Sequence, residues 1–139
     1  MKLGKRGQVG VEYMILIGFL SFAIFVILAF SFLYSDKIKD RIKTNQVESF
    51  AANLINSAES VFFAGEPSRT TVRLYLPDGV ESITISNDSI IIETRVSGGR
   101  NVRAYESSVP LNGTILPGEG TRKLTLEAKS NFVDIRQAS

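Results

Sequence analysis

Three patterns of hydrophobic and polar residues follow one another along the chain. Residues 13–34 contain no Asp, Glu, Lys or Arg, so 22 consecutive residues are uncharged. As a helix they would span ~33 Å, enough to cross the hydrocarbon core of a bilayer. Beyond them apolar residues recur at steps of three and four, which predicts that the helix continues with one apolar face. Its members are Ile38, Ile42, Val47, Phe50, Ala51, Leu54, Ile55, Ala58, Val61 and Phe62.

A stop signal for this helix lies at residues 65–67, Gly-Glu-Pro. Glycine ends helices readily, and proline cannot continue one. No Pro or Gly lies between Phe19 and Ala64. We therefore predict one helix from about Val9 to Phe63, which would be ~80 Å long.

After Pro67 the pattern changes to alternation of apolar and polar residues, with tight turns rich in Gly, Asn and Asp. This pattern is typical of short antiparallel strands. A loop is expected from Pro110 to Gly120. Six strands are predicted, at residues 70–76, 80–86, 89–96, 100–107, 121–130 and 132–136.

These elements together predict an α+β fold. Its long N-terminal helix has a transmembrane or filament-core half at 8–35 and an amphipathic half at 36–64. The small antiparallel β-sheet of about six strands forms a head at 65–139, and its apolar face packs on the helix from Val47 to Phe63.

The net charge of the chain gives little evidence about its function. The 139 residues contain 16 Lys and Arg against 14 Asp and Glu, a net charge of +2. Three of the positive residues lie within residues 1–7, and without that segment 13 positives face 14 negatives, a net charge of −1. The basic balance is therefore poor evidence for nucleic-acid binding, and no nucleic-acid partner is expected.

The residue types also limit the chemistry. The chain has no Cys and no His, which excludes thiol nucleophiles, imidazole metal sites and a Ser-His-Asp hydrolase. The carboxylates occur singly, without metal-ligand spacing. We expect no catalytic residues, no metal and no cofactor, and do not expect an enzyme.

The N-terminus carries the most specific motif. Lys5-Arg6-Gly7-Gln8 is followed by Glu12 and then by the uncharged stretch. This arrangement, covering about residues 5–20, resembles the archaeal type IV pilins, and more narrowly the class III signal-peptide group. Mature chains of that group begin with Gln and carry Glu at the fifth position.

The resemblance implies a leader at residues 1–7 and cleavage between Gly7 and Gln8 by a prepilin peptidase of the membrane. It also implies a homo-oligomeric helical filament, with an assembly ATPase and a membrane platform protein as further partners. Bacterial pilins usually begin with an N-methylated Phe and contain a helix-breaking Pro, whereas the first Pro here is Pro67. Archaellins usually lack the Glu, so Glu12 favours a pilus that serves in adhesion.

Glu12 is costly at the edge of hydrocarbon unless it is paired. Cleavage would create an α-amine at Gln8, and in a low-dielectric bundle this amine attracts Glu12 of a neighbouring subunit. The alternative is an acid in the first helical turn, favoured by the helix dipole and left among lipid headgroups.

Two sequons, at Asn87-Asp88-Ser89 and Asn112-Gly113-Thr114, fall in predicted turns. They make Asn87 and Asn112 candidate glycosylation sites of an extracellular glycoprotein. The alternative is that Asn, Asp and Gly are simply what turns require.

The expected location is the cell membrane for the single-pass precursor, with its head outside, and the cell surface for the assembled filament. Two other functions stay open. One is a minor pilin or pseudopilin of a secretion or DNA-uptake machine, and the other is a monomeric membrane-anchored binding domain.

Overall fold

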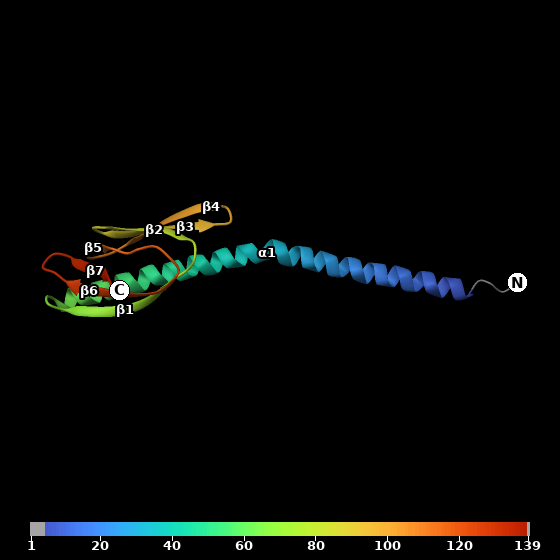
Figure 1. The fold of residues 1–139 in the computed structure, drawn as a ribbon, viewed down its shortest axis with the longest axis horizontal. Coiled ribbons are helices and arrows are strands. Elements are labelled where there is room, and N and C mark those ends of the chain that lie inside the picture. The colour runs from blue at the N-terminus through green and yellow to red at the C-terminus, as the bar shows by residue number, and fades with distance from the viewer. Residues whose placement is uncertain (1–4, 139) are drawn as a thin grey trace. The chain divides into compact units, whose positions relative to one another are not determined.

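The computed structural model describes the backbone of residues 5–138 and the side chains of residues 9–138. Its one helix, α1 (Lys5–Ala64), has 60 residues and is labelled in Figure 1. It ends at Gly65, which has a φ of 80° and whose N–H donates to the Phe62 carbonyl at 3.0 Å. The predicted uninterrupted helix and its stop signal are confirmed.

Seven strands follow in two sheets. One sheet has three strands in the order β2-β3-β4, and the other has four in the order β1-β6-β7-β5. All pairs are antiparallel except β5 with β7. The strands are β1 (Arg69–Leu76), β2 (Val80–Ser86), β3 (Ser89–Val96), β4 (Gly99–Glu106), β5 (Leu111–Thr114), β6 (Gly120–Ala128) and β7 (Val133–Gln137).

The α+β fold is thus confirmed, whereas three details of the prediction are wrong. There are seven strands, they form two sheets, and β5 lies inside the segment 110–120 that was expected to be a loop. β5 has only four residues, too few to show an alternating pattern. Its partner β7 lies some 20 residues away, and parallel pairing leaves no hairpin turn to mark it.

Gly113 allows β5 to lie close to β7. Its φ is 144°, and a Cβ at this position would lie 2.1 Å from the backbone oxygen of Ile135. No real side chain fits there, so the parallel pair depends on a residue without one.

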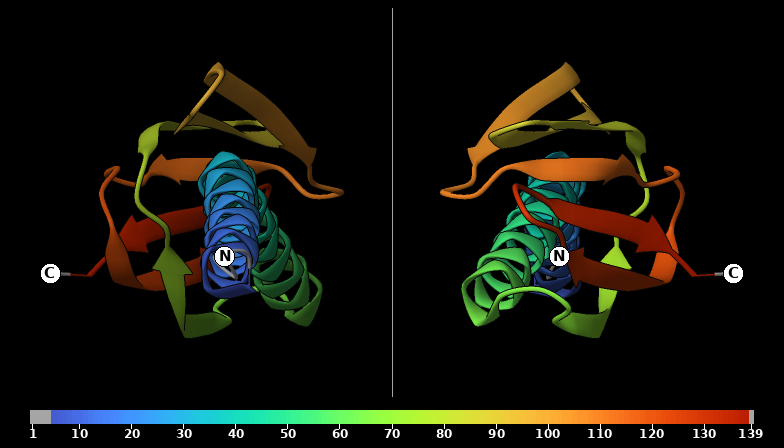
Figure 2. Two further views of the ribbon diagram at one scale, coloured as in Figure 1. Left: turned by 90° about the vertical axis from the view of Figure 1, so that its right-hand side faces the viewer. Right: turned by 90° about the vertical axis from the view of Figure 1, so that its left-hand side faces the viewer.

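The chain divides into two compact units, Met1–Ile38 and Lys39–Ser139. In the second unit, strands lie around the second half of α1, with β2-β3-β4 on one side of it and β1 with β6 on the other (Figure 2). Their inner faces and the helix enclose one core. Its members are Val47, Phe50, Ala51, Leu54, Ile55, Ala58, Val61, Leu76, Val80, Ile83, Ile90, Ile92, Val109, Leu111, Ile115, Leu124, Leu126, Ala128, Val133 and Ile135.

The helix segment predicted to pack on the sheet, Val47–Phe63, is confirmed from Val47 to Val61, whereas Phe63 at its end is 74% exposed. Ile38 is 56% exposed and Ile42 52% exposed, and Phe62 is half-buried. A period of 3.6 residues marks a face of a helix but not the point along the helix where other elements begin to cover it.

Candidate functional site

The N-terminal motif lies on the first turns of α1. Gly7 and Gln8 are helical, and the Gln8 side chain lies outside the described residues, as do residues 1–4 of the predicted leader. Glu12 is one turn further along the helix and is exposed. It makes no ion pair with another described side chain, so the partner expected for it would have to come from elsewhere.

The apolar residues that follow Glu12 are exposed on every side of the helix. Met14 and Phe32 are each 77% exposed and Leu28 is 48% exposed, while Val26 is half-buried. By length and composition α1 can cross a membrane, and none of its most apolar stretch is buried in the described structure. This first half of α1, from Val9 to Ile38, is called the stem below.

The two sequon asparagines, which are 25 positions apart in the sequence, are close together in the head. Asn87 lies in the β2–β3 turn as predicted, and its carbonyl accepts the N–H of Leu111 at 2.7 Å. Asn112 directly follows Leu111 in the sequence, and it lies in β5 instead of the predicted turn. Both side chains are exposed, so both remain accessible to an enzyme that attaches glycans.

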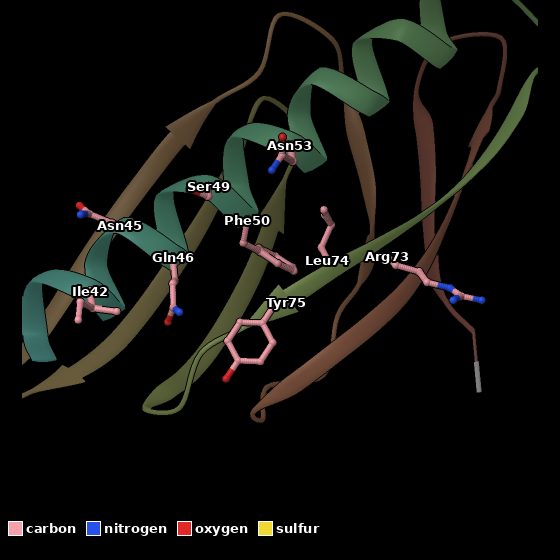
Figure 3. Close-up of a pocket in the computed structure, with 9 residues that line it drawn as sticks. All are labelled: Ile42, Asn45, Gln46, Ser49, Phe50, Asn53, Arg73, Leu74 and Tyr75. Carbon is pink, nitrogen blue, oxygen red and sulfur yellow. The ribbon is translucent and has the colours of Figure 1, made fainter.

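A groove of about 500 Å³ runs between α1 and the edge strand β1 (Figure 3). Phe50 and Leu74 provide apolar surface, while amide and hydroxyl groups come from α1. No carboxylate lines it and Arg73 is its one charged residue, so it offers no acid–base pair for catalysis. The lining residues are Ile42, Asn45, Gln46, Ser49, Phe50, Asn53, Arg73, Leu74 and Tyr75.

The charges on the β2-β3-β4 sheet are paired with one another. The Glu81 carboxylate forms ion pairs with Arg95 and, at 3.1 Å, with Arg100. Arg100 also lies 3.5 Å from Glu93. This network balances two acids against two bases across three neighbouring strands.

The charged side chains of the four-stranded sheet are paired less completely. The Lys129 ammonium, 2.8 Å from the Glu127 carboxylate, lowers the pKa of that carboxyl group, mainly through this hydrogen bond. The Arg136 guanidinium contacts Asp134 at 2.6 Å. Partial desolvation and the nearby Glu119 carboxylate raise the pKa of the Tyr75 hydroxyl, which donates to Glu119 at 3.3 Å.

Within the described part of the chain, no group of three or more His, Cys, Asp or Glu side chains is arranged to hold a metal ion. The arrangements that remain are an uncovered apolar stem, two adjacent sequons and charged sheet faces.

The chain matches no protein-family model, no curated protein and no solved structure.

Three features of the head could not be found from the sequence. The groove needs α1 beside β1, the neighbouring sequons need β5 beside the β2–β3 turn, and the facing charges of the four-stranded sheet need the register of β1 with β6. Alternating polar positions in residues 70–76 and 121–130 indicated two strands that each have an exposed face. No pattern in neighbouring residues indicated that these two strands pair with each other.

Proposed function

We propose that this chain is the precursor of a structural subunit of a type IV pilus-like surface filament. A prepilin peptidase removes residues 1–7, and the mature subunits stack through the stem. The head forms the outer wall, and the filament serves in adhesion.

The observation that carries this proposal is the uncovered stem. Apart from the half-buried Val26, its large apolar side chains are 48% exposed or more from Val9 to Ile38, far beyond what a soluble monomer exposes to water. A bilayer can cover it before assembly, and the stems of other subunits can cover it afterwards. A stem that is apolar on all sides suits both surroundings.

Glu12 gives the stacked stems their register. In a dry bundle an isolated carboxylate is strongly unfavourable, so it favours the one position in which a neighbour's α-amine at Gln8 approaches it. Cohesion comes from apolar packing, and this pairing sets the step between subunits.

The further parts of the proposal follow from the pilin resemblance. An assembly ATPase and a membrane platform protein would extract the mature chain from the membrane, where the head faces outward. The two sequons would then carry glycans on the filament surface.

N-terminal mass spectrometry of the protein from its native envelope tests the processing. A mature chain that begins at Gln8 is expected. An intact Met1 in an assembled filament would rule out this mechanism.

The substitution Glu12→Gln tests assembly. Filaments seen by electron microscopy should be lost while the cleaved subunit stays in the membrane, because the neutral amide cannot pair with the amine. Glu48→Gln is the matched control, since Glu48 is also an exposed carboxylate of α1, held only by Arg103 at 3.9 Å. Normal filaments from the Glu12 variant would refute the register role and favour a monomeric anchored domain.

A minor subunit is distinguished from a major one by abundance. As the major subunit, this chain should dominate the protein in sheared filaments, whereas a minor pilin or pseudopilin would be a trace component.

A further inference from the structure

Pairing of β1, β6 and β7 brings three basic side chains and two threonines onto one face. Arg73 lies opposite Lys123, and Thr71 lies opposite Thr125. Thr125 in turn lies opposite Arg136 of β7. Directly opposed residues and residues two apart on a strand share a face of the sheet, so these five side chains form one surface. It is called the threonine–basic face.

This surface is the outer one, away from the core. Thr71, Arg73, Lys123 and Arg136 are exposed, and Thr125 is half-buried. Intervening residues Val72, Leu124 and Leu126 point inward and belong to the core or pack against it. The two threonine hydroxyls lie 3.3 Å apart, so they already form a hydrogen-bonded pair.

Arg73 and Lys123 face each other without an acid between them. Neither makes an ion pair with any described carboxylate. Like charges directly opposed in a sheet are unfavourable for folding. On the β2-β3-β4 sheet the opposed pair Arg95 and Arg100 shares the Glu81 carboxylate. The four-stranded sheet has no such acid at the corresponding place.

We infer that the threonine–basic face binds a linear acidic polysaccharide, whose carboxylate or sulfate groups lie between Arg73 and Lys123. A guanidinium offers two parallel N–H donors that match such oxyanions. The hydroxyls of Thr71 and Thr125 lie beside them in the same row as Arg136, where they meet the hydroxyl groups of the sugar.

The composition of the face favours a polysaccharide over a nucleic acid. Glu127 and Asp134 lie on the same surface, opposite each other on β6 and β7, and reduce its positive charge. A duplex carries one charge for each ~1.7 Å of its axis and needs a more uniformly basic surface. The aromatic ring of Tyr75 is tied through its hydroxyl to Glu119, so the face has no row of aromatic rings on which bases could stack.

An acidic polysaccharide would be the target of the proposed adhesion. Only this role in adhesion rests on the proposed function. Binding itself is a property of the head. It is therefore measured with the full chain in detergent, where no filament is required, and filament formation is scored separately by microscopy.

The experiment compares the double variant R73Q/K123Q with the unmodified chain, using heparin as the probe in calorimetry at low salt. The variant is expected to bind at least ~10-fold more weakly, because it loses two charge-assisted contacts. The matched control is R95Q/R103Q, which removes the same charge from the other sheet and should bind within ~2-fold of the unmodified chain.

Three outcomes would overturn the inference. One is an unmodified chain that does not bind heparin, and another is an equal loss of binding in the control, which would mean that only total charge matters. The third is duplex DNA binding as tightly as heparin and depending equally on Arg73 and Lys123. All four substituted side chains are exposed, so both variants should melt at the temperature of the unmodified chain. Melting curves of the two variants check that a loss of binding is not caused by unfolding.

Discussion

The two halves of α1 differ in what covers them. In the stem, Leu28 is 48% exposed and Phe25 is 70% exposed, whereas in the second half Leu54 is 0% exposed and Phe50 2% exposed. Both halves are rich in apolar residues and both are helical. The head supplies its own partner for the second half, whereas nothing in the described chain buries the stem. One helix thus combines a segment that packs in the core of the head with an apolar segment that nothing in the described chain covers.

The largest difference between the halves should appear when the same residue type is truncated in each. Leu54→Ala empties a fully buried site and should lower the free energy of unfolding of the head by ~2–5 kcal/mol. Its melting temperature in detergent, followed by circular dichroism, should fall by roughly 10 °C or more.

Leu28→Ala is the paired change in the stem. It should alter the melting temperature of the head by no more than ~2 °C, because Leu28 is not part of the core. An equal loss of stability in both variants would contradict the division of α1 into an uncovered half and a packed half.

A pair of glycines sharpens the same comparison. In Gly113→Ala the new Cβ would meet the Ile135 oxygen at 2.1 Å, at a φ that L-residues rarely adopt. The head should lose about 2 kcal/mol or more of stability, with faster hydrogen exchange of the amides in β5 and β7. Gly10→Ala, where nothing lies within 4 Å, should leave that exchange unchanged. Slow exchange retained in the Gly113 variant would show that β5 does not need its close approach to β7.

The smallest effect concerns a surface ion pair of the head. Because Lys129 lowers the pKa of Glu127 below its ordinary value of 4.5, the folded state binds a proton there less readily than the unfolded chain. The stabilisation is fully present above that ordinary value, and it disappears as the pH falls through the lowered pKa.

Lys129→Gln should therefore lower the melting temperature slightly at pH 7 and not at all at the acidic end of a titration. Lys123→Gln, which removes a lysine without a described acid partner, should show no such pH dependence. A difference between Lys129→Gln and the unmodified chain that stayed constant down to the lowest pH would contradict the pairing.

Much of the head could be predicted from local patterns. β2 and β3 have the predicted bounds, and the other expected strands differ by one or two residues, because alternation and turn residues act over short distances. β5 was missed because four residues carry too little pattern, and the break into two sheets depends on strand pairings that no local signal specifies. For the same reason Asn87 was placed correctly in a turn and Asn112 was not.

Charge spacing, helical periodicity and the motif at Lys5-Arg6-Gly7-Gln8 are properties of neighbouring residues. They were enough to locate α1, its uncharged stretch and the lone carboxylate of Glu12. Residues far apart in the chain met only when the strands paired. β1 and β6 set Arg73 opposite Lys123, and the hydrogen bond from Leu111 to Asn87 brought the sequons together. Such contacts follow from which surfaces bury most apolar area together, and that is a property of the whole head.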